Sequence, residues 1–295
     1  RELIKNINNS FNPKFYLNEM GDIDKNSFVI KPDGLTGGKG VKLYPDHFNN
    51  SDDAVNYINS LDNYLIEERL YGEEFSLMAF CDGDTLKFMP IVQDYKRAYI
   101  DDKGPNTGSM GSVSNSDHKL FFLTDEDIIK CQDLMNLTVY QMNNDSIYQG
   151  ILYGSFMKIY DGQLKLIEYN CRFGDPEGIN VLSLLKTPLH LIFKAIIEKK
   201  LNQVNIKWAN LSTVLRYVVP KNYPNETNTY QFKLDNFNNI YLASIKTEYD
   251  WVSHANVLSY FTTTKSRSYA ICVKGNSIED CVKELDQYNI PANMY

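Results

Sequence analysis

Short apolar runs, separated by glycine, proline or charged turns, recur along the whole chain and predict more strands than helices. In the first two thirds they predict strands at 27–31, 41–44, 63–67, 74–81, 86–92, 151–159 and 164–169. The last two runs meet at Asp161 and Gly162, a pair that strongly favours a hairpin. Similar runs later in the chain predict strands at 212–219, 240–246, 257–263 and 268–274.

Helices are expected where a capping residue precedes a longer amphipathic stretch. Thr124, with Asp127 three residues later, predicts a helix that continues to about Met142. Weaker start signals predict three more helices, at about 51–60, at 188–200 and after Ser277. The resulting mixture of strands and helices indicates an α+β fold.

Two stretches show no periodic pattern. Residues 1–24 are polar and are expected to be irregular. A loop of about twenty residues is expected to run to about Asp117, and loops of that length inside compact domains usually serve a function.

Composition excludes several classes of protein. A net charge of −7 argues against a nucleic-acid partner, since a phosphate-binding surface should be basic. The five scattered cysteines form no CxxC pair, so neither a disulfide framework nor a zinc site is indicated. No apolar run approaches the ~18 residues of a membrane span and no signal peptide is recognisable, so no membrane partner is expected. A cytoplasmic enzyme fits these features.

The residues best suited to bind a metal or a phosphate follow the apolar run that begins at Leu164. Glu168 and Asn170 are two residues apart, and side chains at that spacing in a strand share a face. Their oxygens suit Mg²⁺, which usually keeps waters and substrate phosphates as its other ligands. Arg172 then offers a planar donor fork for phosphate or carboxylate. An ordinary edge strand with polar residues is the alternative interpretation.

A glycine-rich segment follows the first predicted strand. Four of the seven residues 34–40 are glycines, so backbone N–H groups can converge on an anion, with Lys31 and Lys39 supplying charge. This is not a Walker sequence, because no Ser or Thr follows Lys39. A plain mobile hairpin is the alternative, but next to a candidate Mg²⁺ site the segment favours a nucleoside triphosphate.

The acidic segment 67–74 joins two predicted strands and could border an adenine ring with its backbone N–H and C=O groups. Glu73, after the turn at Gly72, could reach ribose hydroxyls. A solvated acidic hairpin is the alternative.

These three segments, in this order, resemble the ATP-grasp enzymes. The sequence GPNTG at 104–108, the segment 148–154 and the sequence NCRFGDPE at 170–177 resemble more narrowly the glycinamide ribonucleotide synthetases, or phosphoribosylamine–glycine ligases. The similar motifs cover roughly residues 28–190. The resemblance implies an ATP-grasp domain at 1–205, with a nucleotide-binding lobe at about 25–85 and a substrate and metal lobe at about 86–205, followed by a small, diverged C-terminal α/β domain at 206–295.

The same resemblance implies the roles of individual residues. ATP-binding residues are expected to be Lys31, Gly37, Gly38, Lys39, Gly40, Glu68, Leu70 and Glu73. Catalytic residues are expected to be Arg172, Lys31, Asp94, Lys96 and Arg97. Substrate contacts are expected from Asn106, Thr107, Gly108, Asp175 and Glu177, and metal ligation of Mg²⁺ or Mn²⁺ from Glu168 and Asn170.

The chain departs from the family's pattern at several glycines. Ser109 stands in place of a glycine, Lys221 and Asn222 replace a glycine pair, and residues 265–267 read Lys-Ser-Arg where the family has Gly-Gly-Arg. Glycines at the last two places usually permit a positive φ or a close backbone approach, so altered loops are expected there, whereas Ser109 is expected to affect substrate contacts more than ATP contacts. The family's preceding Rossmann-like domain is also not found, and Arg1 falls near a nucleotide-binding lysine of the family.

The resemblance implies a ligase of purine biosynthesis that joins glycine to 5-phosphoribosylamine through glycyl phosphate, with ATP giving ADP and phosphate. Two alternatives are an ATP-grasp ligase with another carboxylate or amine and a non-catalytic ATP-binding module. Because part of the sugar-phosphate site in the family lies in the preceding domain, we expect residues 1–295 to bind Mg-ATP but to need that domain, separate or fused, for efficient synthesis.

Overall fold

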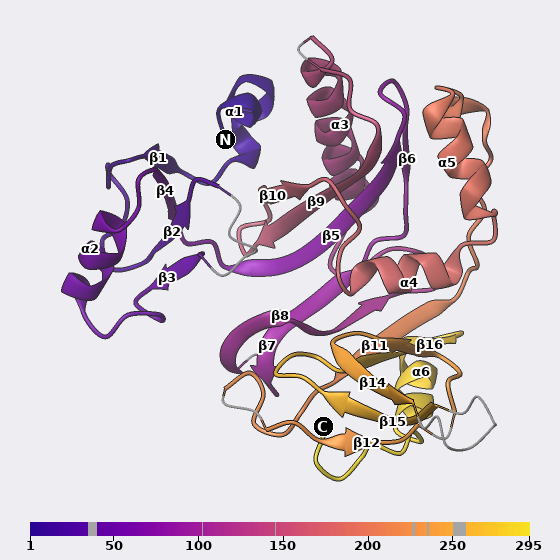
Figure 1. Ribbon diagram of the computed structural model, residues 1–295. Helices are drawn as coiled ribbons and strands as arrows, with labels where there is room; N and C mark the ends of the chain where they lie inside the picture. Colours follow the sequence, from indigo (N-terminus) through magenta and orange to yellow (C-terminus); the bar gives the residue numbers. More distant parts are fainter. Residues whose placement is uncertain (35–39, 102, 145, 226–227, 235, 250–257) are drawn as a thin grey trace. The chain divides into compact units, whose positions relative to one another are not determined.

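The structure is a computed structural model, and it describes residues 1–34, 40–101, 103–144, 146–225, 228–234, 236–249 and 258–295 (Figure 1). The chain forms two compact units, each built from several segments. The first unit comprises residues 1–74, 122–148 and 154–169, and the second comprises 75–121, 149–153 and 170–295. Helices accompany sheets whose recorded strand pairs are antiparallel, so the predicted α+β class is confirmed.

A four-stranded antiparallel sheet forms the start of the first unit. Its strands, in spatial order, are β1 (Phe15–Leu17), β4 (Tyr64–Glu68), β2 (Phe28–Pro32) and β3 (Lys42–Tyr44). Ile30 and Ile66 are fully buried and form a core with Ala54 of helix α2 (Ser51–Asn59). Because side chains alternate along a strand, Lys31 and Glu67 lie on the other face of the sheet. The sheet therefore separates a hydrophobic side from a charged side.

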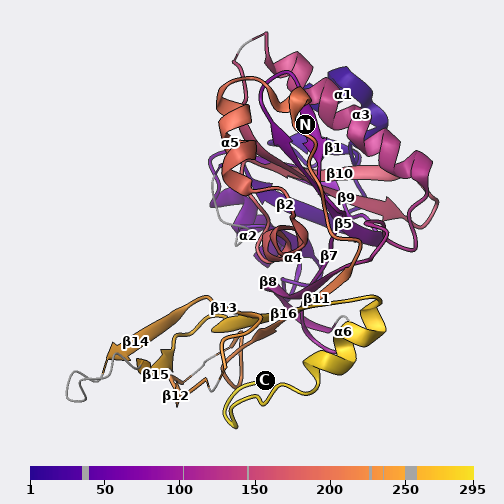
Figure 2. The same ribbon diagram turned by 90° about the vertical axis from the view of Figure 1, so that its right-hand side faces the viewer.

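Two helices and a second sheet follow. Helix α1 (Glu2–Asn8), followed by a 3₁₀ turn at Asn9–Phe11, packs beside α3 (Asp125–Met142), as Figure 2 shows. The predicted capping box at the start of α3 is present, whereas the prediction that residues 1–24 are irregular was wrong. The second sheet has the order β10 (Leu164–Asn170), β9 (Gly150–Ile159), β5 (Gly72–Cys81), β6 (Leu86–Phe88). The hairpin predicted at residues 161 and 162 is confirmed as the β9–β10 connection.

A five-stranded antiparallel sheet lies at the centre of the second unit. Its order is β13 (Ile240–Leu242), β16 (Tyr269–Gly275), β11 (Ser212–Val218), β8 (Lys103–Ser114), β7 (Gln93–Tyr99). Helix α6 (Ile278–Leu285), capped by Ser277, packs against β11 and β16. Most of the loop expected before Asp117 is thus a hairpin, β7 and β8, and that prediction was wrong. The hairpin carries the GPNTG sequence to the edge of the sheet.

The remaining elements of the second unit are shorter. They are α4 (Glu177–Leu184), α5 (Leu189–Ile197), a 3₁₀ turn at Leu201–Gln203, and a sheet of β12 (Gln231–Phe232), β15 (Leu258–Thr263) and β14 (Ile245–Tyr249). The strand predicted at 240–246 is divided between β13 and β14. Glu177 is the first residue of α4.

Candidate functional site

A buried ion cluster occupies the charged face of the first sheet. The Glu67 carboxylate, 4% exposed, accepts a hydrogen bond from Arg1 Nε at 2.6 Å and lies 2.7 Å from Lys31 Nζ. Arg1 Nη2 donates to the second carboxylate oxygen at 2.9 Å, so the arginine fork binds Glu67 through two nitrogens. Two cations thus meet on one carboxylate at the position that the sequence assigns to nucleotide phosphates.

Arg1 also connects this cluster to β10. Its guanidinium donates to the carbonyl of Leu166 and, at 2.8 Å, to that of Ile167. Glu168, the predicted metal ligand, follows directly on the same strand. Burial opposes ionisation of Glu67, but the charges of Lys31 and Arg1 outweigh it and hold the pKa of this carboxyl below its ordinary value. Arg1 therefore ties β10, the strand that carries Glu168, to the carboxylate of Glu67.

The predicted nucleotide segments are only partly described. Gly37, Gly38 and Lys39 lie outside the described residues. Gly40 is described, and its carbonyl accepts a hydrogen bond from the Tyr57 hydroxyl at 2.6 Å. The structure places Glu68 at the end of β4, with its carboxylate accepting from the Lys14 N–H at 2.8 Å, Leu70 just beyond that strand, and Glu73 near the start of β5. The proposed adenine and ribose roles of Glu68, Leu70 and Glu73 stay predictions.

The candidate substrate loop is the β7–β8 hairpin of the second unit. Asp94 lies opposite Ser112, and Arg97 lies opposite Asn106. The Arg97 guanidinium donates to the Gly104 carbonyl at 2.8 Å. The Thr107 hydroxyl donates to the Lys96 carbonyl at 2.8 Å. The predicted residues of both strands are thereby brought together, and the hairpin is tied across its width by side chains.

The two family-specific motifs meet at Arg267, which precedes β16. Its Nη2 donates to Asp175 at 2.6 Å, and its Nη1 donates to the Gly108 carbonyl and to the Ser109 carbonyl at 3.2 Å. Its guanidinium lies 4.2 Å from the ring centre of Tyr217, whose hydroxyl donates to Asp175 at 2.6 Å. Burial and the hydrogen bond to Asp175 raise the pKa of Tyr217, so its hydroxyl keeps its proton.

Glu177 is the buried carboxylate of this region. It is 3% exposed and accepts hydrogen bonds from the hydroxyls of Ser76 and Tyr153, each at 2.9 Å. Burial and the Glu177 charge raise the pKa of Tyr153. Gly174 packs so closely that a Cβ there would lie 2.3 Å from a Glu177 oxygen. This carboxylate is therefore held rigidly at the start of α4.

The metal-binding prediction rests on β10. Glu168 is exposed and Asn170 is half-buried. Among the described residues, no three His, Cys, Asp or Glu side chains gather as a metal site. An ion bound to Glu168 and Asn170 would need phosphate and water oxygens to complete its coordination, as Mg²⁺ commonly does. Arg172, predicted to neutralise phosphate, is exposed and donates to the Phe173 carbonyl at 2.8 Å.

Two of the replaced glycines keep the backbone conformation that glycine would allow. Ser109 has φ +90° and Asn222 has φ +72°. The Ser109 hydroxyl donates to the Gly111 carbonyl at 2.9 Å and accepts from its N–H at 3.2 Å, so it binds its own hairpin. Asn adopts positive φ more readily than most residues. A positive φ is therefore present at both positions without a glycine.

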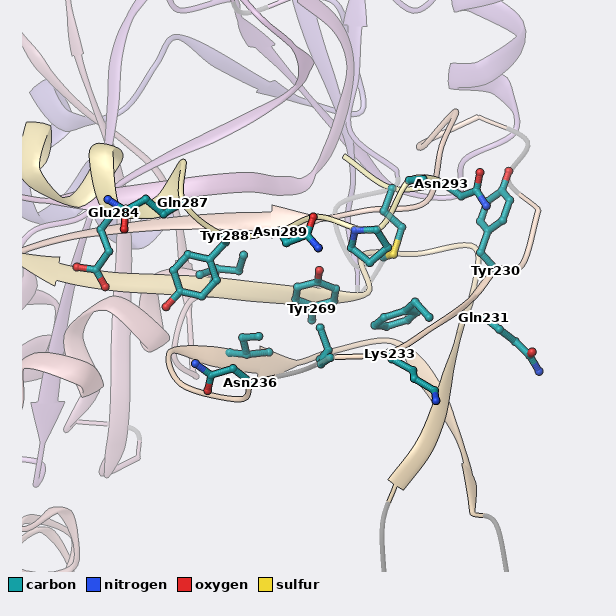
Figure 3. Close-up of a pocket in the computed structure, with 17 residues that line it drawn as sticks. Tyr230, Gln231, Lys233, Asn236, Tyr269, Glu284, Gln287, Tyr288, Asn289 and Asn293 are labelled. Atoms are coloured by element: carbon teal, nitrogen blue, oxygen red, sulfur yellow. The ribbon is translucent and has the colours of Figure 1, made fainter.

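A cavity of about 550 Å³ lies elsewhere in the second unit, between β12, β16, α6 and the last residues of the chain. Figure 3 shows Tyr269 at its centre, with Tyr288 and Asn289 nearby. None of the residues predicted from the sequence to bind ATP, metal or substrate lines it. We therefore assign it no part in the candidate site.

Several residues of the site were not predicted from the sequence as site residues. Glu67 was predicted only as the start of the acidic segment that could border adenine. Tyr153 lies in the family-like segment 148–154 but was assigned no role, and Ser76 and Tyr217 carry no local signal because they lie within ordinary strands. Arg267 could have been found from the sequence, since it ends the segment Lys-Ser-Arg that stands where the family has Gly-Gly-Arg.

Comparison with known proteins shows the family of the chain. The model of the phosphoribosylglycinamide synthetase ATP-grasp (A) domain matches residues 4–178. The chain belongs to this family. Phosphoribosylamine–glycine ligases from Methanocella arvoryzae and Methanococcoides burtonii are 48% and 40% identical to it, over 68% and 90% of this chain.

A solved structure shows the same fold. The chain resembles a phosphoribosylamine–glycine ligase from Thermotoga maritima with a TM-score of 0.73 and 22% identity, over 100% of this chain and 74% of that one. The ATP-grasp fold predicted from the sequence is thereby confirmed. The chain spans 47% and 60% of the lengths of the two archaeal relatives. In the described part of the chain, no helix is long and apolar enough to cross a membrane.

Proposed function

We propose that this chain forms the ATP-grasp part of an ATP-dependent ligase that joins glycine to 5-phosphoribosylamine. The products are glycinamide ribonucleotide, ADP and phosphate, which places the reaction in purine biosynthesis, in the cytoplasm. One observation carries the proposal: Arg267 links Gly108 of the GPNTG sequence to Asp175 of NCRFGDPE. These two motifs distinguish the family from other ATP-grasp proteins, and they meet within one compact unit.

ATP is proposed to bind through the first unit. Lys31, Arg1 and the loop 34–40 supply positive charge and N–H groups for its phosphates, and the backbone of the segment from Glu68 to Leu70 borders adenine. Glu73 is proposed to meet the ribose. The buried Glu67 keeps both cations at one place before the nucleotide arrives. Charge neutralisation of this kind is the main requirement for phosphoryl transfer.

Mg²⁺ or Mn²⁺ is proposed to bind Glu168 and Asn170. Both are oxygen donors at the end of β10, which suits hard cations whose remaining ligands are phosphates and water. When bound, the ion would neutralise charge on the nucleotide phosphates. Arg172 is proposed to assist by donating hydrogen bonds to the same charge.

The proposed reaction depends on how the protein positions its substrates. The glycine carboxylate attacks the γ-phosphate to give glycyl phosphate and ADP, and the sugar amine then attacks the acyl carbon and releases phosphate. No protein nucleophile is needed, so side chains act by orienting substrates. Asp94, Lys96, Arg97, Asn106 and Thr107 are proposed to face them from the β7–β8 hairpin. Asp175 and Glu177 add carboxylates for amino groups.

A substrate-dependence assay tests the proposal. Residues 1–295 are assayed for ADP release with ATP, Mg²⁺, glycine and 5-phosphoribosylamine formed from ribose 5-phosphate and ammonia. A parallel sample contains the amino-terminal domain of a relative in trans. We expect ADP release to require glycine, and formation of glycinamide ribonucleotide to rise by orders of magnitude with the added domain.

Replacing glycine by other amino acids decides between the proposal and a related ligase. The replacement of a family glycine by Ser109 prompted that alternative, but its hydroxyl is engaged by Gly111. Equal turnover with alanine or serine would overturn the assignment of glycine. Absence of glycine-dependent ADP release in both samples, with ATP bound, would favour a non-catalytic ATP-binding module.

A further inference from the structure

Arg267 makes directed contacts to three segments outside β16. It lies outside that strand, yet its guanidinium reaches Asp175, two carbonyls of the β7–β8 hairpin and the face of Tyr217. The contacts span 92 residues in sequence to Asp175 and 159 to Gly108. The Arg267 side chain is 14% exposed, whereas the Asp175 carboxylate that it binds is 57% exposed. One half-buried cation thus joins three separate segments.

Both carboxylate oxygens of Asp175 accept hydrogen bonds from the protein, yet the side chain is partly exposed to solvent. One of its oxygens accepts from the Tyr217 hydroxyl and the other from Arg267, each at 2.6 Å. Its side chain is nevertheless 57% exposed. Each carboxylate oxygen has a further lone pair, so Asp175 can accept another hydrogen bond from solvent. A fixed carboxylate with an open side suits a cationic or amino group.

The glycine at 108 fits the same arrangement. A Cβ at that position would lie 2.9 Å from Arg267 Nη2. Any other residue would push the guanidinium away from Asp175 or displace the hairpin. The absence of a side chain at Gly108 thus leaves room for the Arg267 guanidinium in this position.

We propose that Arg267 is a positioning residue of the ligase and that it acts with Tyr217. Together they hold Asp175 as a fixed acceptor for the amino group of a substrate, and Arg267 locks the hairpin carbonyls at 108 and 109 in register with it. Arg267 itself does not touch the transferred phosphoryl group. This inference rests on the proposed function, which supplies the amino-group substrates.

The test compares Arg267→Met with Arg267→Lys and Tyr217→Phe. Methionine removes the charge and the fork, lysine keeps the charge alone, and phenylalanine keeps the ring but removes the bond to Asp175. Arg216→Met is the control, because Arg216 is 46% exposed and pairs only with the exposed Asp286 in the contacts recorded for it. Circular dichroism checks that each variant is folded.

Two readouts are measured. Hydrogen exchange follows the amides of Ser109 and Gly111, which donate to Thr107 and Ser109 hydroxyls. We expect about tenfold faster exchange or more in Arg267→Met, since bonds to a charged group are lost. Steady-state kinetics should show KM for glycine or 5-phosphoribosylamine raised by about tenfold, with KM for ATP within about twofold of the parent. Arg267→Lys should behave much like Arg267→Met, with fast exchange and a raised KM.

The outcomes separate the two claims. Unchanged exchange at Ser109 and Gly111 in Arg267→Met would overturn the positioning role, whatever the activity. A parallel rise of KM for ATP and for glycine would also overturn it, because the effect would then be general. If the parent protein forms no product even with the amino-terminal domain of a relative in trans, the proposed function fails, and the exchange data still decide whether Arg267 orders the hairpin. If Arg267→Met does not fold, the same two readouts are taken from Tyr217→Phe.

Discussion

Glu67 is the residue whose loss should most disturb the first unit. Its carboxylate is 4% exposed and lies 2.6 Å from Arg1 and 2.7 Å from Lys31. Glu67→Gln keeps the side-chain size but leaves two cations beside a neutral amide. Removing one partner of a buried ion pair costs about 3–5 kcal/mol. Lys31 is 20% exposed and can turn towards water, so we expect a loss near the lower end, about 3 kcal/mol.

Urea unfolding followed by circular dichroism measures this loss. The matched control is Glu126→Gln, the same chemical change at a carboxylate that is 76% exposed and pairs with Lys130 along helix α3. Exposed pairs of this kind contribute about 0–1 kcal/mol. If Glu67→Gln lowers the free energy of unfolding no more than the control does, the cluster does not stabilise the sheet as argued.

The pH dependence gives a second check on the same variant. Lys31 and Arg1 overcome the effect of burial and hold the pKa of Glu67 below its ordinary value of 4.5. A carboxyl with a depressed folded-state pKa adds stability above its unfolded pKa and loses it as pH falls through the folded value. The difference between parent and Glu67→Gln should therefore be constant above about pH 5 and shrink below pH 4.5. A difference that grows on acidification would contradict the reasoning.

Further predictions concern the metal, the nucleotide, a helix and a turn. Glu168→Ala should abolish Mg²⁺-dependent ATP turnover without unfolding the protein; near-normal turnover would remove the site. Lys31→Met should weaken ATP binding in calorimetry, and an unchanged affinity for ATP would count against the proposed phosphate-binding role of Lys31. Asp127→Ala, which breaks the α3 capping box and the 2.7 Å pair with Lys158, should cost about 1–2 kcal/mol in urea unfolding. Asn222→Gly should be nearly neutral and Asn222→Ala should cost about 1 kcal/mol, because φ is +72°; equal losses would contradict this.

Local patterns in the sequence predicted much of the fold. The capping box at Thr124 places α3 correctly because its hydrogen bonds involve residues three apart. Helix α2, predicted at about 51–60, spans Ser51–Asn59 and is capped by Asn50, whose side chain accepts from the Asp53 N–H. The β7–β8 hairpin was missed because its residues are polar, and strand propensity follows from burial against neighbours more than from composition.

The candidate site depends on contacts that no local pattern encodes. Arg1 reaches carbonyls about 165 residues away, and Arg267 reaches Gly108 over 159 residues. Strand order decides such contacts, and sequence periodicity does not specify it. Motif resemblance did bring Glu168, Asp175 and Glu177 to attention, since their residue types suit the chemistry. The side chains that hold them in place became visible only with the fold.

The central claim is that a glycine carboxylate is activated as an acyl phosphate. It is tested most directly with glycine labelled by ¹⁸O in its carboxylate, incubated with ATP, Mg²⁺, 5-phosphoribosylamine and this chain, with the family's amino-terminal domain in trans. The account predicts one labelled oxygen in the inorganic phosphate for each product formed, because the amine displaces phosphate that carries a carboxylate oxygen. Unlabelled phosphate, with ATP consumed, would show that the carboxylate never attacked the γ-phosphate and would contradict the account.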